Sequence, residues 1–230
     1  PRADARTAEL CKMYKKVLAI EVDTDLIPLL SEALREYDNL EIMEADAMKV
    51  DFTALVREKF PGEKVSVCAN LPYYITSPVI MRLLDSSEVF DSIVVMIQKE
   101  VADRLCSQPG SADFGAITLA VTYKAEVEKC FSVSAGNFIP PPKVTSSVIK
   151  MNIREEPPVS PKSVENMFAL IRAAFAQRRK TFSNAVRAVS SKYSKEDIEN
   201  ALISLGLPAD VRGEKLGLCE YAALSDILPL

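Results

Sequence analysis

The chain has 230 residues, of which 48% are hydrophobic and 26% are charged. This composition is typical of a folded globular protein that buries about 70% of its unfolded surface, and it excludes a disordered tail. No apolar run approaches the roughly 18 residues of a membrane span, so we expect no membrane attachment. The five cysteines are scattered and form no C-x-x-C pair, which argues against a disulfide framework or a zinc knuckle. We therefore expect a monomer in the reducing cytoplasm, without a metal site.

Two features of the ionisable residues narrow the possible chemistry. Histidine is absent, which excludes Ser-His-Asp and Cys-His nucleophiles, imidazole metal sites and histidine general bases. The formal charge of −4 taken alone argues against a nucleic-acid binder. However, the window from Arg172 to Lys195 holds seven basic and no acidic residues, so it carries +7 and leaves −11 for the rest of the chain. The sequence therefore predicts one basic face on an acidic body.

The first hundred residues alternate between strand-like and helix-like patterns. Short apolar runs occur at Val17–Val22, Leu40–Glu44, Val65–Ala69 and Ile93–Ile97. Runs that are apolar on both faces are typical of parallel strands covered by helices. Helices are predicted between them, at Leu26–Tyr37, after a cap at Asp51, and around Pro78–Leu84 with Thr76 or Ser77 as the cap. This order predicts a doubly wound α/β fold.

The middle of the chain changes pattern. Gln98–Cys106 is helix-like and is followed by a loop at Gln108–Gly115 and a helical stretch at Ala116–Tyr123. Two strand-like runs, Glu126–Val133 and Ser146–Ile153, then predict an antiparallel hairpin at the edge of the sheet.

The last third of the chain is predicted to be a separate helical domain. Three prolines in Glu155–Lys162 indicate a linker. Beyond it, Val164–Leu207 has a helical pattern with a cap at Ser194 and a stop at Gly206. We therefore expect an α/β domain at 1–154, a linker at 155–162 and an all-α domain at 163–230.

The most informative string is Asn70-Leu71-Pro72-Tyr73, which follows a predicted strand. Ligands of doubly wound sheets gather at such strand ends, although N-x-P-Y by itself is also a common turn. The longer string NLPYYITSPVI resembles the fourth motif of adenine amino-methyltransferases and, in its full length, that of ribosomal RNA adenine dimethyltransferases.

Further strings resemble motifs of the same family in the same order along the chain. They are Ala19–Leu30, Glu44–Phe52, Asn137–Ile149 and Phe175–Val186. The chain thus resembles the bacterial-type small-subunit dimethyltransferases, the KsgA family. The resemblance implies a Rossmann-like class I methyltransferase sheet followed by a small helical domain. It also implies S-adenosylmethionine as the cofactor, and adenines of small-subunit ribosomal RNA in an immature small subunit as the substrate during ribosome biogenesis.

The resemblance assigns catalytic roles to five residues. An adenine amine is a poor nucleophile because its lone pair is delocalised into the ring. In the family, the Asn70 side chain and the Leu71 carbonyl would each accept one N–H of this amine and favour the localised form. Pro72 would fix the turn and Tyr73 would stack on the extruded base. Phe138 would pack on the base from another side, the alternative being a simple core aromatic.

The cofactor-binding residues implied by the resemblance lie at strand ends. The carboxylate of Glu21 would accept hydrogen bonds from the ribose hydroxyls, the alternative being a solvated strand terminus. Asp46 would bind the adenine amine of S-adenosylmethionine, with Val22 and Ala47 as apolar contacts to the ring. Asn70 would adjoin the cofactor as well as the substrate.

The basic window is predicted to bind RNA. Its centre, QRRKTFSN, lies in the predicted helical segment, and the cations expected to contact phosphates are Arg178, Arg179, Lys180 and Arg187. A basic run is usually only a solvated face. Seven cations without an anion, in an otherwise acidic chain, favour a phosphate-binding surface.

The resemblance breaks at the first motif of the family, a glycine-rich loop of the form G-P-G-x-G-x-L-T. Thr7–Leu10 fits the helix that follows this loop, but PRADAR precedes it and no glycine occurs before Gly62. The sequence is expected to be truncated, to omit residues, or to carry PRADAR as a replaced loop. In each case we expect weak cofactor binding and impaired catalysis in the chain as printed.

Two other functions stay open from the sequence. One is a large-subunit adenine methyltransferase of the macrolide-resistance type, which shares the fold and the chemistry. The other is a non-catalytic ribosome-assembly factor that kept the fold for RNA binding.

Overall fold

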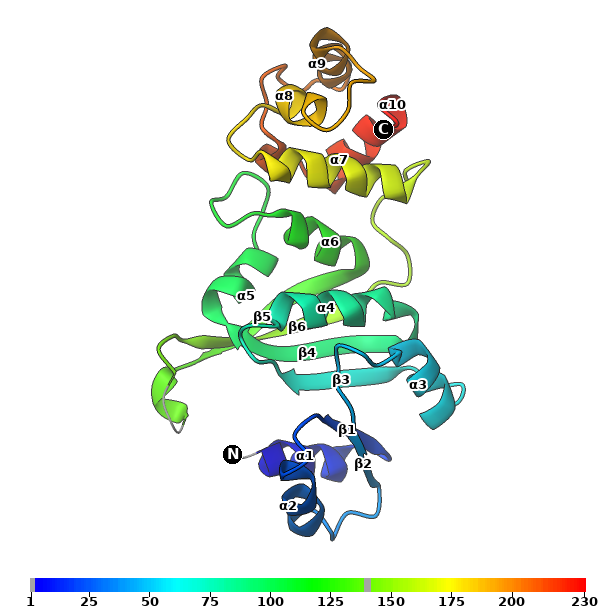
Figure 1. The fold of residues 1–230 in the computed structure, drawn as a ribbon, viewed down its shortest axis with the longest axis vertical. Helices are drawn as coiled ribbons and strands as arrows, with labels where there is room; N and C mark the ends of the chain where they lie inside the picture. The colour runs from blue at the N-terminus through cyan, green and yellow to red at the C-terminus, as the bar shows by residue number, and fades with distance from the viewer. Residues whose placement is uncertain (1–2, 139–141) are drawn as a thin grey trace.

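The structure is a computed structural model that describes residues 3–138 and 142–230. Three parts follow one another along its long axis (Figure 1). A small N-terminal unit lies at one end, a four-stranded sheet with its helices lies in the middle, and a helical domain lies at the other end.

The N-terminal unit is a two-stranded parallel sheet with two helices. Strand β1 (Val17–Glu21) pairs with β2 (Leu40–Glu44) along their whole length. Helices α1 (Ala3–Met13) and α2 (Leu26–Ala33) accompany this pair. Helix α2 is shorter than predicted because the chain turns back toward β2 after Leu34, where the N–H of Tyr37 donates to the Leu34 carbonyl at 3.0 Å.

The larger sheet has the strand order β3-β4-β6-β5. Its strands are β3 (Val65–Asn70), β4 (Phe90–Gln98), β5 (Ala125–Val133) and β6 (Ser146–Ile153). Strands β3 and β4 are parallel, whereas β6 is antiparallel to both β4 and β5. The predicted edge hairpin is therefore confirmed. The four N-terminal runs were expected in one sheet, but they lie in two separate sheets. No described strand pairs with the free edge of β1 or of β3 to join them.

One face of the larger sheet carries the main core. Along β4, Ile93, Val95 and Ile97 are fully buried, whereas Val94 and Met96 between them are partly exposed. This alternation is that of a strand covered on one face. The covering helices are α3 (Phe52–Lys59), α4 (Thr76–Asp85), α5 (Lys99–Leu105) and α6 (Ala116–Lys124).

Helix starts agree only in part with the expected caps. Asp51 caps α3 as predicted, accepting a hydrogen bond from the N–H of Ala54 at 2.9 Å. Neither Thr76 nor Ser77 caps α4, because Ile75 is the N-cap residue and makes no side-chain bond. The Thr76 hydroxyl donates backward to the Pro72 carbonyl at 3.1 Å instead.

The C-terminal domain has four helices: α7 (Val164–Ala176), α8 (Phe182–Arg187), α9 (Lys195–Ser204) and α10 (Leu218–Ile227). The single pattern predicted at Val164–Leu207 is broken twice, since Thr181 and Ser194 begin new helices as side-chain caps. The cap at Ser194 was predicted, and α9 ends two residues before the predicted stop at Gly206, whose φ is +73°.

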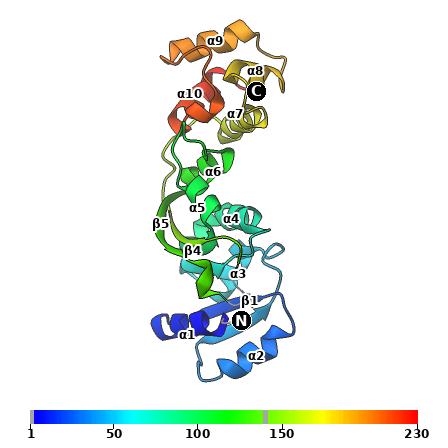
Figure 2. The same ribbon diagram turned by 90° about the vertical axis from the view of Figure 1, so that its left-hand side faces the viewer.

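The helical domain shares its core with the α/β domain. Phe114, Leu119 and Tyr123 belong to the same buried cluster as residues of α7, α8, α9 and α10. The rings of Tyr123 and Phe168 meet edge-on, 5.4 Å between centroids. Figure 2 shows α7 directly above α6. The predicted linker thus divides the sequence into two parts, but the hydrophobic core of the helical domain includes residues from both sides of it.

No helix within residues 3–138 and 142–230 combines the length and the hydropathy needed to cross a membrane.

Candidate active site

The Asn70-Leu71-Pro72-Tyr73 string forms a braced turn at the end of β3. Asn70 is the last residue of the strand, and the N–H of Leu71 donates to the Met96 carbonyl of β4 at 3.2 Å. The Pro72 carbonyl accepts hydrogen bonds from the N–H of Ile75 and from the Thr76 hydroxyl, both at 3.1 Å. The Asn70 side chain is exposed and bonds to no other described residue. Its amide is therefore available to a ligand.

Tyr73 is held by a residue that the sequence analysis missed. Its hydroxyl lies 2.8 Å from the hydroxyl of Ser146, which is only 1% exposed. Ser146 is the first residue of β6 and lies between Gln98 of β4 and Val133 of β5. The sequence did hold a sign of this role. Ser146 is a hydroxyl residue at the start of an apolar strand, and it lies within Asn137–Ile149, which resembles a motif of the family.

Phe138 follows a short 3-10 helix, η2 (Ala135–Asn137), between β5 and β6. Its N–H donates to the Ala135 carbonyl at 3.2 Å, and its ring belongs to neither buried cluster of the described chain. The residue is half-buried, between a core and a fully exposed position. Pro140, Pro141 and Ile139 of the same motif lie outside the described residues.

The two predicted cofactor carboxylates lie at neighbouring strand ends. One oxygen of Glu21 accepts the N–H groups of Val22 and Asp23 at 2.8 and 2.9 Å. The other oxygen has no partner among the residues that the structure describes. The N–H of Ala45 donates to the Glu21 carbonyl at 3.0 Å, which brings Asp46 beside this strand end.

Asp46 and the apolar residues complete this group. One oxygen of Asp46 accepts the N–H of Met48 at 2.9 Å, and the other lies 3.7 Å from the ammonium of Lys49. Val22 is 65% exposed, and Ala47 packs partly against the main core. A free carboxylate oxygen beside an exposed apolar side chain fits the ribose and base of a nucleoside.

No described residue offers a comparable group for the methionine end of such a cofactor. Residues 3–6, considered as a replaced glycine loop, form the first turn of α1 instead, so that interpretation is wrong for them. The Glu21 and Asn70 groups lie on different sheets, and no hydrogen bond of the described chain joins them. The residues present therefore fit the nucleoside half of S-adenosylmethionine.

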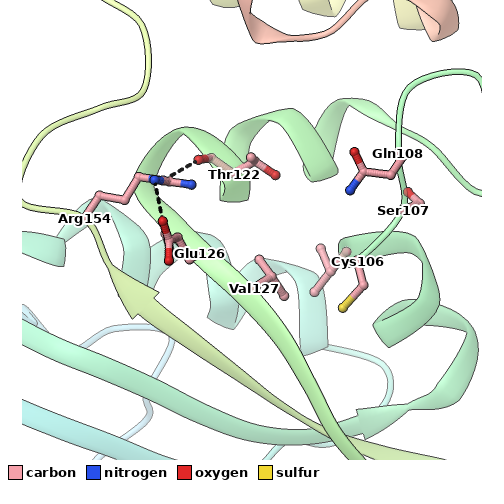
Figure 3. Close-up of a pocket in the computed structure, with 9 residues that line it drawn as sticks. Cys106, Ser107, Gln108, Thr122, Glu126, Val127 and Arg154 are labelled. Atoms are coloured by element: carbon pink, nitrogen blue, oxygen red, sulfur yellow. Dashed lines mark hydrogen bonds and ion pairs between the residues drawn. The ribbon is translucent and has the colours of Figure 1, made fainter.

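A pocket of about 220 Å³ lies elsewhere, between α5, α6, β5 and β6 (Figure 3). Arg154 borders it, bonded to the Thr122 carbonyl at 3.2 Å and to the Glu126 carboxylate at 2.9 Å. Because this pocket lies at the start of β5 and the end of β6, it is at the opposite end of these strands from Ser146. None of the predicted site residues lines it.

The basic window is not one helix face, because its centre is a turn. The N–H of Lys180 donates to the Gln177 carbonyl at 2.8 Å, between α7 and α8. Arg179, Lys180 and Arg187 are exposed, and their side chains bond to nothing else in the described ranges. Arg178 differs, because its guanidinium already bonds to the Glu214 carboxylate and to the Ala112 carbonyl.

Comparison with known proteins connects these features. The sequence profile of a family described as ribosomal RNA adenine dimethylase matches residues 3–216. The chain belongs to the ribosomal RNA adenine dimethylase family. It is therefore an RNA adenine methyltransferase by family.

Curated relatives of the dimethylase family match nearly the whole chain. The ribosomal RNA small subunit methyltransferase A of Lachnoclostridium phytofermentans is 44% identical, over 99% of this chain and 79% of that protein. The protein of the same name from Geobacillus thermodenitrificans is 43% identical, again over 99% of this chain and 79% of its own length.

Solved structures confirm the fold. A dimethyladenosine transferase from Plasmodium falciparum is 25% identical with a TM-score of 0.78, covering 95% of this chain and 83% of that one. The 23S rRNA methyltransferase ErmE is 22% identical with a TM-score of 0.71, covering 97% of this chain and 86% of that one. The dimethylase thus has the Rossmann-like class I methyltransferase fold that the sequence predicted.

Proposed function

We propose that this dimethylase transfers methyl groups from S-adenosylmethionine to the exocyclic amine of adenines in small-subunit ribosomal RNA. The observation that carries the proposal is the exposed, unpaired amide of Asn70 at the end of β3, in a chain whose family profile matches residues 3–216. The small subunit is favoured as the substrate because the relatives at 40–44% identity bear that name.

The Asn70 turn would activate the amine by accepting its two N–H groups. The Asn70 side-chain oxygen and the Leu71 carbonyl are the two acceptors. The backbone that carries both is fixed, since the Leu71 N–H is bonded to β4 and the turn is braced through Pro72. Fixed acceptors localise the nitrogen lone pair and stabilise the positive charge that develops on the nitrogen during attack. No histidine is required for this step.

The target base would be held by aromatic side chains. Tyr73 is fixed through its hydroxyl, so only its ring face and edge remain for the base. Phe138 would approach from the segment between β5 and β6. A base that is extruded from the RNA and stacked in this way is presented to the acceptors in one orientation.

The cofactor would be held at the ends of β1 and β2. The free oxygen of Glu21 would accept the ribose hydroxyls, Asp46 would accept the adenine amine, and Val22 and Ala47 would contact the ring. When bound, S-adenosylmethionine supplies a methyl group activated by its sulfonium charge. Asn70 would border both the cofactor and the substrate.

RNA would bind along the turn and helix that carry Arg179, Lys180 and Arg187. These cations are exposed and unpaired within the described residues, as phosphate contacts require. Their position in the helical domain separates RNA binding from the cofactor carboxylates. The partner would be the immature small subunit, and the protein would act as a monomer in the cytoplasm. Sedimentation of the protein with and without subunits would test the binding to subunits and the monomeric state.

The test is methyl transfer from radiolabelled S-adenosylmethionine to purified ribosomal particles. It uses the 230-residue chain and the product of the whole gene, each with an Asn70→Ala control. We expect label in the adenines of immature small subunits and none in large subunits. Label in large subunits would support a macrolide-resistance type of methyltransferase. Binding to small subunits without label from either protein would indicate a non-catalytic assembly factor.

A further inference from the structure

The loop between α5 and α6, Gln108–Gly115, reaches from the α/β domain to the helical domain (Figure 1). At its tip the N–H of Gly110 donates to the Glu214 carbonyl at 2.7 Å. The ammonium of Lys215 donates to the Gly110 carbonyl at 3.1 Å. Gly110 has a φ of +86°, a conformation that favours glycine. Both backbone groups of one loop residue are thus bonded across the domain boundary to η3 (Gly213–Lys215).

Arg178 strengthens this junction from a second direction. Its Nε lies 2.6 Å from the Glu214 carboxylate, and its Nη2 donates to the Ala112 carbonyl at 2.6 Å. The side chain of Glu214 is 20% exposed and that of Arg178 is 42% exposed. The planar guanidinium therefore bonds to the helical domain and the α/β domain at the same time.

Apolar packing completes the contact. Phe114, near the end of the loop, is buried, and its ring lies 6.1 Å from that of Phe175 in α7. A Cβ on Gly217 would lie 3.4 Å from the ring of Pro109, so this part of the helical domain is also in close contact with the loop. The loop is fixed on both sides of the Arg178 bonds.

We propose that Arg178 is a positioning residue that fixes the orientation of the helical domain on the α/β domain, rather than a ligand of RNA phosphates. The role in RNA recognition rests on the proposed function. An RNA that binds the cations of the helical domain and presents an adenine at Asn70 makes two contacts with one rigid body. The gain from the second contact depends on the spacing of the two sites, and this spacing is lost when the domains move independently.

Arg178 and Arg179 are adjacent in sequence but differ in their surroundings. Arg179 is exposed without a side-chain partner in the described chain, so its contribution to RNA binding is electrostatic. Arg178 acts through Glu214 and Ala112, so its contribution depends on the shape of its side chain. Lysine keeps the charge but cannot reproduce a planar fork that bonds to two groups.

Four variants separate the two roles: Arg178→Lys, Glu214→Ala, Gly110→Ala and the control Arg179→Lys. Hydrogen exchange of residues 108–115 is measured first, in the absence of RNA. We expect exchange to be faster by on the order of tenfold in the first three variants and unchanged in Arg179→Lys. Arg178→Lys and Glu214→Ala lose side-chain bonds that hold the loop, whereas Gly110→Ala strains a backbone with a φ of +86° and crowds the Lys215 side chain. Unchanged exchange in both Arg178→Lys and Glu214→Ala would overturn the proposal.

Affinity for small subunits is then measured as a function of salt. We expect Arg178→Lys and Glu214→Ala each to weaken binding by roughly tenfold without changing the salt dependence, and the double variant to be no worse than either. If Arg178 contacted phosphate, Arg178→Lys would bind normally and Glu214→Ala would bind as well as the parent or better. That result would overturn the positioning role.

The two measurements also separate this inference from the proposed function. A parent protein that does not bind small subunits would contradict the proposed function. The exchange experiment would still decide whether Arg178 holds the domains together.

Discussion

The hydroxyl of Tyr73 lies 2.8 Å from that of Ser146, and this hydrogen bond joins the turn after β3 to the start of β6. It fixes an aromatic ring beside the proposed base site. We expect Tyr73→Phe and Ser146→Ala each to slow single-turnover methyl transfer by roughly fivefold, since a neutral hydrogen bond contributes about 1 kcal/mol. The double variant should be no slower than the slower single one. Additive losses would show that the two hydroxyls act independently.

Asn70→Ala should lower the rate of methyl transfer by roughly 10²–10³, the scale of losing one preorganised charge-stabilising hydrogen bond. Cofactor affinity, measured by calorimetry, should change little because Glu21 and Asp46 lie on the other sheet. Single-turnover kinetics in the whole-gene product measures the rate. A near-normal rate in this variant would remove Asn70 from the mechanism.

Replacing both Arg179 and Lys180 by alanine should flatten the dependence of log affinity on log salt by about 1.4–1.8, since each phosphate contact contributes about 0.7–0.9. Lys195→Ala is a matched control from the same basic window, because its ammonium already lies 3.3 Å from the Glu199 carboxylate. It should leave the slope nearly unchanged. Equal slopes for the parent and the double variant would show that Arg179 and Lys180 do not contact RNA phosphates.

Gly213→Ala should destabilise the helical domain by about 1–3 kcal/mol, through overpacking. An added Cβ would lie 2.5 Å from the Cβ of Ala174 and 2.8 Å from the hydroxyl of Tyr221, both in buried positions. Gly136→Ala is the control, because no atom of the described residues lies within 4 Å of its added Cβ. Urea unfolding measures both. Equal stability of the two variants would contradict this packing.

Asp103 should make the stability of the α/β domain depend on pH. Hydrogen bonds from Lys129 and Lys99 hold the pKa of this carboxyl below its usual value. A lowered pKa in the folded state means that the stabilisation is present above about pH 4, the unfolded value, and is lost as the pH falls.

Asp103→Asn should therefore cost about 1 kcal/mol or less at pH 7, because these pairs are partly exposed. The cost should shrink toward pH 3, as followed by urea unfolding at both values. Asp91→Asn, at an exposed carboxylate of β4 without an ion pair in the described chain, should show no such change. A cost that is independent of pH would show that the charge of Asp103 is not the cause.

Much of the architecture was readable from local patterns. Successive apolar residues mark a strand, so β1, β2 and β3 were found to within one residue, although none of their residues is fully buried. Asp51 and Ser194 were found as caps because a side-chain acceptor before a helix bonds to the N–H three residues later. The placement of Asn70 at a strand end follows from the same local information.

Features that depend on long-range contacts were not readable. The residues of Val17–Glu21 and Val65–Asn70 do not indicate whether the two strands share a sheet. That depends on which strand lies between them. The break in the helical pattern after Ala176 was missed for a related reason. Burial of Phe182 overrides a helical periodicity that is compatible with one long segment.

The sequence by itself determined the fold class, the position of the Asn70 turn at a strand end and the location of the basic window, because each depends on residue type and spacing. Only the tertiary structure decided what neighbouring residues of the same type do. Arg178 and Arg179 are chemically identical, adjacent and both exposed, yet one bonds to Glu214 and Ala112 while the other has no side-chain partner among the described residues. The physical reason is that a side chain's partners are set by segments remote in sequence, here 36 and 66 residues away.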